Sequence, residues 1–346
     1  MNTQHVQESA RFPQQQPHQA EHLTDNHGRQ INYLRLAITD RCNLRCLYCR
    51  PERGVPFIPH DEILRFEELE RFVRIVTSMG ISKIRVTGGE PFSRRGCMDF
   101  LARLKSMPGV ESLYVTTNGV KTARFLDELA DIGINGINLS LDTLDPKRFW
   151  QITRRDYLAS VLATLHGALQ RNIPLKVNSV VLPDTTDEEI CSLAELARDK
   201  PLTLRFIEAM PFSGTTRAEK LTNGNLLQRL QRIFPAMTAC LQTHLPTTAR
   251  IFTHPGFAGK LGMINGYSRL FCATCNKVRI TPEGILKTCL YDNGSLNLKE
   301  LVRGPASDLT IARKILHCIQ NRFANGHEAE KASRRTTEPS MGMIGG

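Results

Sequence analysis

Short apolar runs alternate along this chain with longer stretches in which apolar residues recur every three or four positions. The short runs are rich in β-branched residues, which predicts six strands at residues 33–39, 83–87, 113–117, 136–141, 175–181 and 202–208. Helical periodicity fills the intervals, including residues 66–79, 121–132, 158–170 and 187–198. Six strand–helix repeats in series predict an α/β fold with a parallel sheet.

Polar and glycine-containing motifs come at the carboxyl ends of these predicted strands. In an open doubly wound sheet only the strands beside the switch point share a site, whereas all strand ends of a barrel converge on one mouth. Six repeats instead of eight therefore predict an incomplete (β/α)6 barrel of the TIM type. The motifs are, in chain order, a cysteine group at 42–49, Gly88-Gly89-Glu90, residues 116–119, Ser140 with Asp142, Asn178 and Met210.

Composition divides the chain into three parts. Residues 1–30 are rich in Gln, His and Glu, which predicts a disordered N-terminal arm without a function. Residues 31–212 carry the repeats and form the predicted barrel. From residue 213 the repeats stop, and 213–346 are predicted to form a C-terminal region that covers the open side of the barrel and ends in a flexible tail.

Length and hydropathy exclude several classes of protein. With 346 residues, of which 41% are hydrophobic, the chain can bury a substantial core. No apolar run approaches the ~18 residues of a membrane span, and the first 30 residues lack the apolar core of a secretory signal. The sequence therefore predicts a soluble protein of the cytoplasm.

Six of the ten cysteines fall into two tight groups, which indicates metal ligands. The groups are Cys42-x3-Cys46-x2-Cys49 and Cys272-x2-Cys275-x13-Cys289. Three thiolates leave one iron of a cube-shaped iron–sulfur cluster open for a ligand, whereas electron carriers are usually closed by four. Zinc stays the alternative at each group, although structural zinc generally takes four protein ligands. The other cysteines, Cys97, Cys191, Cys240 and Cys318, are predicted to be small buried hydrophobes.

The net charge of +11 and the pI near 9.3 favour a polyanionic ligand. Apart from Lys331, Arg334 and Arg335, the basic residues form no continuous cluster that would suit nucleic acid. Convergent cations in a pocket instead suit a nucleoside triphosphate, and no Gly-rich P-loop is present. Several cations are placed where strands are predicted to end, namely Arg35, Lys83, Arg85, Lys176 and Arg205.

The first cysteine group, with Tyr48 before its last cysteine, resembles the signature of the radical S-adenosylmethionine (SAM) enzymes. More of the chain is similar to the GTP 3′,8-cyclase family of molybdenum cofactor biosynthesis. The similar stretches are Asn32-Tyr-Leu-Arg35-Leu-Ala-Ile-Thr-Asp-Arg-Cys42 and Cys272-Ala-Thr-Cys275-Asn276-Lys277-Val278-Arg279, with Cys289. The resemblance runs from about residue 30 to the C-terminus, and that family also has a (β/α)6 fold.

The resemblance implies a radical cyclase that acts on GTP with two 4Fe-4S clusters. One cluster, on Cys42, Cys46 and Cys49, would bind SAM, and the other, on Cys272, Cys275 and Cys289, would bind the guanine base. The residues implied to contact SAM are Tyr48, Gly89, Ser140 and Met210. Those implied to contact GTP are Arg35, Arg85, Thr116, Lys176, Lys277, Val278 and Arg279, and the terminal Gly345 and Gly346 are implied to enter the active site.

The same resemblance implies partners. They are an external electron donor, a second copy of the chain in a homodimer in equilibrium with the monomer, and cyclic pyranopterin monophosphate synthase, the next enzyme of the pathway, which takes the product. Neither a membrane nor a nucleic acid is expected.

Two other functions stay open on the sequence. Another radical SAM enzyme with an auxiliary cluster, such as a peptide maturase, tends to carry more C-terminal cysteines and lacks the Arg/Lys set. A non-catalytic metal-binding nucleic-acid protein would hold zinc and bind DNA or RNA in a salt-dependent manner. The chain also departs from the family pattern: Arg50 stands for a usual Met, Lys277 for a common Arg, and Gly96 for an acidic residue after Arg94 and Arg95.

Overall fold

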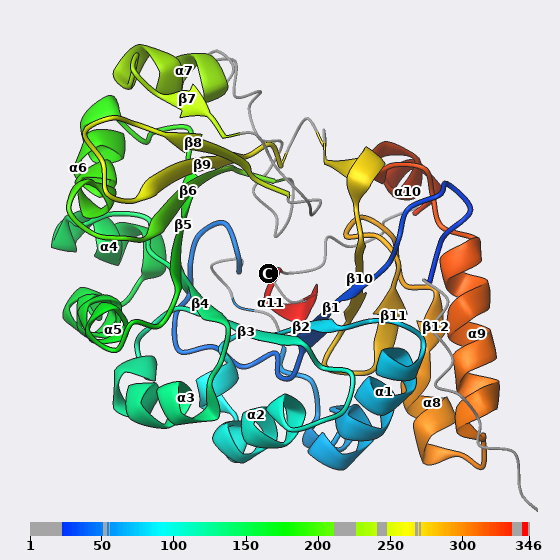
Figure 1. Ribbon diagram of the computed structural model, residues 1–346. Helices are drawn as coiled ribbons and strands as arrows, with labels where there is room; N and C mark the ends of the chain where they lie inside the picture. Colours follow the sequence, from blue (N-terminus) through cyan, green and yellow to red (C-terminus); the bar gives the residue numbers. More distant parts are fainter. Residues whose placement is uncertain are drawn as a thin grey trace, which may run out of the picture.

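The computed structural model describes residues 23–50, 54, 56–210, 226–240, 248–266, 269, 271–333 and 341–344. One sheet runs in the order β12-β11-β10-β1-β2-β3-β4-β5-β6-β9-β8-β7 and curves around an interior (Figure 1). Strands β1 to β6 are parallel neighbours, so the predicted incomplete barrel is confirmed. They span Tyr33–Ala37, Lys83–Thr87, Ser112–Thr117, Gly136–Ser140, Leu175–Val181 and Thr203–Glu208.

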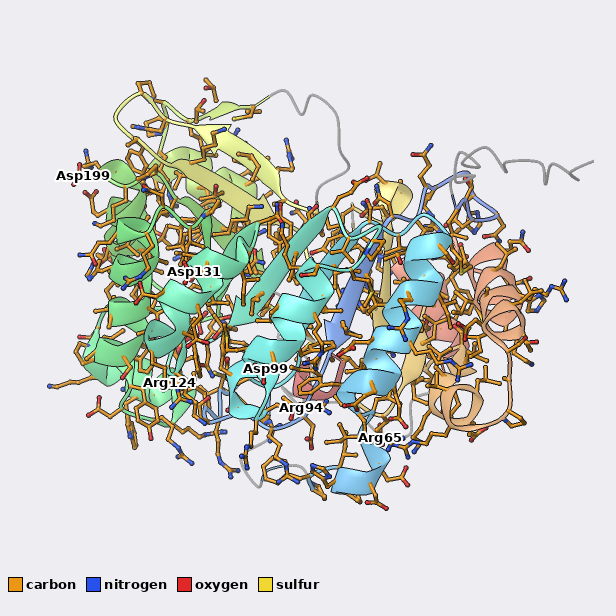
Figure 2. The ribbon with its side chains drawn as sticks, turned by 60° about the horizontal axis from the view of Figure 1, so that its bottom comes forward. Arg65, Arg94, Asp99, Arg124, Asp131 and Asp199 are labelled. Atoms are coloured by element: carbon orange, nitrogen blue, oxygen red, sulfur yellow. The ribbon has the colours of Figure 1, made fainter. Side chains whose placement is uncertain are left out.

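Alternation along the strands places the hydrophobic core between the sheet and its helices. Leu34 and Leu36 of β1 are fully buried, as is Phe72 of the first helix, and all three belong to one apolar cluster. Burying one such side chain contributes about 1.5–3 kcal/mol. The covering helices are α1 (Phe66–Ser78), α2 (Cys97–Lys105), α3 (Leu126–Ile132), α4 (Pro146–Thr153), α5 (Leu158–Gln170) and α6 (Asp187–Arg198). Figure 2 looks onto α2 and α3, where Asp99 and Asp131 lie on the solvent side.

The sequence analysis did not name helices α2 and α4. Both are short, and the residue before each one determines where it begins. Gly96 precedes α2 with a φ of 78°, a left-handed conformation that glycine adopts without strain. Asp145 precedes α4 and accepts the backbone N–H of Arg148 at 2.6 Å. Pro146 is the first helical residue, where its missing N–H costs nothing. The predicted helix at 121–132 also begins as a 3-10 turn, Thr122–Phe125.

The C-terminal region lengthens the sheet at both edges. At one edge β9 (Lys260–Ile264) pairs parallel with β6, followed by β8 (Arg250–Thr253) and β7 (Thr238–Ala239). At the other, β10 (Lys277–Ile280) pairs parallel with β1, followed by β11 (Ile285–Lys287) and β12 (Leu296–Asn297). The described part of this region therefore continues the barrel wall, whereas the sequence predicts a cover over the open side.

Five further helices belong to the C-terminal region. They are α7 (Leu226–Ile233), α8 (Leu298–Arg303), α9 (Asp308–Gln320), α10 (Gly326–Ala332) and α11 (Met341–Ile344). Helix α11 lies inside the ring of strands (Figure 1). Among all helices of the described residues, none has the length and apolar character that crossing a membrane requires.

Residues 23–30 are part of the fold, which corrects the predicted boundary of the disordered arm. Thr24 and Gln30 form a β-bridge, and Leu23 is buried. Asp25 is buried between two arginines, with its Oδ2 2.6 Å from Arg29 Nε and 3.3 Å from Arg322 Nη1. This ion triad attaches the segment to the C-terminal region; residues 1–22 lie outside the described part of the chain.

The ion triad predicts a large effect of Asp25→Ala on stability. Without Asp25, two buried arginines lose their counter-charge, which costs about 3–5 kcal/mol. The pKa of Asp25 is lowered, since hydrogen bonds from Arg29 and His27 outweigh the effect of burial. The aspartate therefore contributes stability above its unfolded pKa, and this contribution is lost as the pH falls through its lower folded pKa. Urea unfolding at neutral pH measures the expected loss.

Asp127→Ala is the matched control for this measurement. Asp127 also pairs with an arginine, Arg171, at 2.6 Å, but its side chain is 82% exposed. Exposed pairs contribute about 0–1 kcal/mol. Equal losses of unfolding free energy in the two variants would contradict the structural role of the triad.

Candidate active site

The inward-facing positions of the strands are polar and line one cavity. Side chains alternate along β1. Leu34 is buried in the hydrophobic core between the sheet and the helices, whereas Tyr33 and Arg35 face the cavity inside the barrel. The cavity is also lined by all six cysteines of the two groups. Predicted SAM and GTP contacts that line it are Tyr48, Gly89, Ser140, Met210, Arg35, Arg85, Thr116, Lys277 and Arg279. Two do not: Lys176 lies with its ammonium 5.3 Å from the ring centre of Tyr114, and the side chain of Val278 is buried in the hydrophobic core.

The first cysteine group forms an irregular loop after β1. Two backbone hydrogen bonds attach this loop to the end of α4, from Arg45 N to Thr153 O at 3.0 Å and from Leu47 N to Ile152 O at 2.9 Å. Burial and the nearby Glu90 raise the pKa of Cys42 to about 11. A thiolate here therefore needs a positive centre, and binding of a metal releases the thiol proton.

The second cysteine group lies at the opposite end of the cavity. Lys277 pairs with Tyr33, so Cys275 precedes β10 beside the amino end of β1. Strand β11 runs antiparallel to β10, which brings Cys289 to the same end. Burial raises the pKa of Cys275, but Lys277 and Arg322 outweigh this effect and the net shift is downward.

The two cysteine groups offer the kind of ligand that iron–sulfur clusters require. Each offers three cysteine thiols to the same cavity, and thiolates are the usual ligands of such clusters. Within the described ranges, no three His, Cys, Asp or Glu side chains are arranged to hold one metal ion. Of the cysteines outside the two groups, Cys97 is buried as predicted, whereas Cys191, Cys240 and Cys318 are half-buried.

Cations of the strands lie over the rings of two tyrosines, Tyr33 of β1 and Tyr114 of β3. The ammonium of Lys83 lies 5.0 Å from the ring centre of Tyr33 and 4.7 Å from that of Tyr114. The guanidinium of Arg85 lies over the same two rings, at 5.3 and 5.7 Å. The ring faces stabilise these charges by cation–π attraction.

The barrel interior lowers the pKa values of its own lysine and arginine side chains. Burial lowers the pKa of Lys176 to about 8, with further contributions from Arg205 and Arg85. Burial likewise lowers the pKa of Lys277 to about 8 and that of Arg205 to about 9. A polyanion in the cavity would reverse these shifts, because an opposite charge favours the protonated form.

These cations lie deeper than the sequence predicts. Lys83 is the first residue of β2 and Lys176 the second of β5, so neither is at the carboxyl end of its strand. Arg35 is in the middle of β1. The sequence analysis identified these residues as charged positions on predicted strands. Because every second side chain of a strand faces inward, as in Lys83-Ile-Arg85-Val-Thr87, they lie inside the barrel instead of at its mouth.

Several buried polar atoms of the interior have no hydrogen-bond partner in the described part of the protein. They are Tyr33 Oη, Arg85 Nε, Thr116 Oγ1, Asn138 Nδ2, Asn178 Oδ1 and Arg205 Nε. Leaving a buried donor or acceptor unpaired costs about 1–3 kcal/mol, so the arrangement favours a polar ligand. Sequence reasoning identified Asn178 as one of the polar strand positions but did not assign Tyr33 and Asn138 to the site, although the period of two along the strands carries the signal.

Gly89 and Glu90 are closely packed at the barrel mouth, next to the first cysteine group. A Cβ on Gly89 would lie 2.4 Å from Arg41 O, so no side chain fits there. The Glu90 carboxylate is fully buried and accepts the N–H of Asn118 at 2.7 Å and the hydroxyl of Thr117 at 2.8 Å. Burial raises its pKa to about 7. Glu90 thereby joins β2 to β3 under the cysteine loop.

Asp142 holds Tyr48 in the cavity wall. The sequence analysis identified Asp142 only as a residue at the end of a strand. Its hydroxyl donates to Asp142 Oδ2 at 2.7 Å, and the N–H of Val180 donates to Asp142 Oδ1 at 2.8 Å. Burial raises the pKa of Asp142 to about 6. The Tyr291 hydroxyl lies 3.7 Å from Met210 Sδ, and both residues line the same cavity.

The departures from the family pattern have structural roles. Arg50 is buried, donates from Nη2 to Asp40 O, and lies 5.3 Å from the ring centre of Phe57. Gly96 begins α2. Gly345 and Gly346 lie outside the described residues, but Ile344 before them is buried and packs with Leu290 and Tyr291.

Two family models match the chain in succession. The Radical SAM superfamily model matches residues 36–197, and the Molybdenum Cofactor Synthesis C model matches residues 202–328. Among solved structures, Streptococcus suis SuiB bound to S-adenosylmethionine is similar, with a TM-score of 0.58 at 13% identity over 92% of this chain and 74% of that one. The anSMEcpe protein with bound AdoMet is similar with a TM-score of 0.53, at 16% identity over 88% and 81% of the two chains.

Curated relatives are more similar in sequence. The GTP 3′,8-cyclase of Heliobacterium modesticaldum is 40% identical over 84% of this chain and 90% of its own length. That of Clostridium perfringens is 37% identical over 83% and 88%. The mouse protein named molybdenum cofactor biosynthesis protein 1 is 40% identical over 85% of this chain, which spans only 46% of the mouse protein.

Proposed function

The chain belongs to the GTP 3′,8-cyclase family of radical SAM enzymes, and from this premise we propose that it converts GTP to (8S)-3′,8-cyclo-7,8-dihydroguanosine 5′-triphosphate in the first step of molybdenum cofactor biosynthesis. One observation carries the proposal most strongly. Two groups of three cysteines line one cavity from opposite ends, and the cations Arg35, Arg85, Lys277 and Arg279 line the same cavity.

The mouth of the barrel holds SAM in this proposal. Cys42, Cys46 and Cys49 would ligate a 4Fe-4S cluster, which when bound would supply one electron for the reductive cleavage of SAM. The main chain at Gly89 lies against the cysteine loop without a side chain between them. Tyr48, fixed by Asp142, and Ser140 and Met210 then orient SAM along the cavity wall.

The interior holds GTP. Cys272, Cys275 and Cys289 would ligate a second cluster, which when bound would hold the guanine base. Arg35, Arg85, Lys277 and Arg279 hold the triphosphate through charge-assisted hydrogen bonds, which are roughly twice as strong as neutral ones. Lys176 joins them from β5 and Thr116 from β3, and Val278 contributes through its backbone. GTP held between the two cysteine groups would have its ribose on the side of the mouth, where SAM would bind.

The barrel wall also keeps water and other hydrogen donors from the reacting carbons. Helix α11 lies inside the ring of strands, and Met341 lines the cavity. We propose that Gly345 and Gly346, which follow α11 in the sequence, enter the active site, because residues without side chains suit a narrow space.

The deciding experiment is anaerobic reconstitution followed by analysis of products. We expect about eight irons per chain, as two 4Fe-4S clusters require, and formation of 5′-deoxyadenosine together with the cyclised nucleotide when GTP is present. Zinc in place of iron, without cleavage of SAM, would support the nucleic-acid alternative. SAM cleavage that responds to a peptide but not to GTP would support a maturase.

A further inference from the structure

The two arginines of the ion triad also contact the second cysteine group. Arg322 donates from Nη2 to Cys275 Sγ at 3.7 Å and from Nη1 to Cys275 O at 3.4 Å. Arg29 donates from Nη1 to Cys272 O at 3.0 Å. Both arginines are buried and line the cavity. The triad therefore holds two of the three cysteines that are proposed to ligate the second cluster.

Further hydrogen bonds fix the guanidinium of Arg322. Its Nη1 lies 3.3 Å from Asp25 Oδ2, and its Nη2 also donates to Lys277 O at 3.2 Å. Its Nε is buried and has no hydrogen-bond partner in the described part of the protein. Buried donors are nearly always paired, and the sulfur atoms of iron–sulfur clusters accept hydrogen bonds. The unpaired Nε therefore suits a cluster on this cysteine group.

The donor at Cys275 is charged, unlike the donors at the first cysteine group that contact Cys42. The sulfur of Cys42 accepts from Leu44 N at 3.4 Å and from Asn118 Nδ2 at 3.5 Å, and both donors are neutral. Arg322 instead brings a full positive charge to the sulfur of Cys275. Hydrogen bonds to sulfur and the charge around a cluster are two of the features that set its reduction potential.

We propose that Arg322 is a positioning residue of the second cluster, which fixes Cys275 and raises the reduction potential of that cluster. The proposal rests on the proposed function, which places a 4Fe-4S cluster on Cys272, Cys275 and Cys289. Reduction adds one electron, and with it one negative charge, to the cluster. A neighbouring cation stabilises the reduced state more than the oxidised state, so the cluster accepts the electron more readily.

Asp25 opposes Arg322 in this role. The side chains of Arg322 and Asp25 are 3% and 0% exposed, so water and salt screen their charges little. The carboxylate offsets part of the positive charge beside the cluster and lowers its potential. The two residues of one ion pair therefore act on the second cluster in opposite directions.

A redox titration of the reconstituted protein tests the role of Arg322. Dithionite supplies the electron, and the electron paramagnetic resonance signal of the reduced cluster is followed against the potential. A Cys46→Ala background isolates the second cluster, because it removes a ligand of the first. Arg322→Gln should lower the midpoint potential by about 59 mV or more, which is a tenfold change in a one-electron equilibrium. Arg322→Lys, which keeps the charge, should restore most of this loss.

Asp25→Asn separates the effect of charge from damage to the fold. It should raise the midpoint potential of the second cluster, whereas Arg322→Gln lowers it, although both substitutions weaken the same ion triad. In the protein with both clusters, neither substitution should shift the potential of the first. Iron analysis identifies any variant that loses its cluster; if Arg322→Gln does, Asp25→Asn decides, and a potential that does not rise contradicts the proposal.

Arg171→Gln is the matched control, because Arg171 also pairs with an aspartate, Asp127, at 2.6 Å, but at the surface. It should leave both potentials unchanged. An unchanged potential in Arg322→Gln, or a fall in both Arg322→Gln and Asp25→Asn, would overturn the proposal. The expected shifts in a protein that forms no cyclised nucleotide from GTP would overturn the proposed function alone. Zinc in place of iron at the second group would overturn both.

Discussion

Cys46→Ala is expected to abolish cleavage of SAM, whereas Cys275→Ala is expected to abolish cyclisation of GTP and spare part of the SAM cleavage. The reason is that the two cysteines line the cavity from opposite ends. Each variant should lose about four of eight irons, and each should lose a different spectroscopic signal. Iron analysis, electron paramagnetic resonance and assays of 5′-deoxyadenosine measure these outcomes.

Cys191→Ala serves as the control, since this half-buried thiol belongs to neither group. It should keep both signals and full turnover. Loss of the same signal in Cys46→Ala and Cys275→Ala would show that the six cysteines serve one centre, and the two-site interpretation would then be wrong.

Removing an interior cation is expected to weaken GTP binding by roughly ten- to a hundredfold. A charge-assisted hydrogen bond contributes about 1.5–3 kcal/mol, and Lys176→Ala or Arg279→Ala removes one such partner. Guanosine, which lacks the phosphates, should bind weakly and be indifferent to Lys176→Ala. Anaerobic titration calorimetry measures both ligands, with iron content as the test of an intact site.

The pH dependence of GTP binding tests the same site in a second way. Burial and nearby arginines lower the pKa of Lys176 to about 8, and a bound triphosphate raises it again. GTP binding near pH 8.5 should therefore take up protons, affinity should fall as the pH rises above 8, and Lys176→Ala should reduce the uptake. Lys314→Ala, an exposed lysine on α9, should change neither affinity nor proton uptake. Equal affinity for GTP and guanosine would contradict the triphosphate site.

The parallel barrel could be predicted from the sequence because strand and helix periods differ and repeat in order. The strands at 83–87 and 175–181 and the helices at 158–170 and 187–198 have the predicted bounds. The edges could not be predicted, since the pairing of β10 with β1 joins residues that are more than two hundred positions apart. Local patterns contain no information on such a pairing.

The site was predictable in its residue types more than in its geometry. Spacing identified both cysteine groups, and polarity identified the cations. Asp25 and Arg29 were missed because their burial depends on Arg322, which lies at the other end of the sequence. Asp142 was noticed only as a strand-end residue, because its partner Tyr48 belongs to a loop whose course no periodicity describes.

The pairing of β10 with β1 also constrains how the chain folds. During synthesis β1 is among the first strands to be made, yet its second neighbour is made only when residues 277–280 follow. Until then one edge of the growing barrel keeps unpaired backbone groups, which are prone to wrong association. Contacts of such long sequence separation slow folding. Closure of this edge is therefore expected to be a late, slow step, and truncation before β10 should yield an aggregation-prone fragment instead of a free-standing barrel.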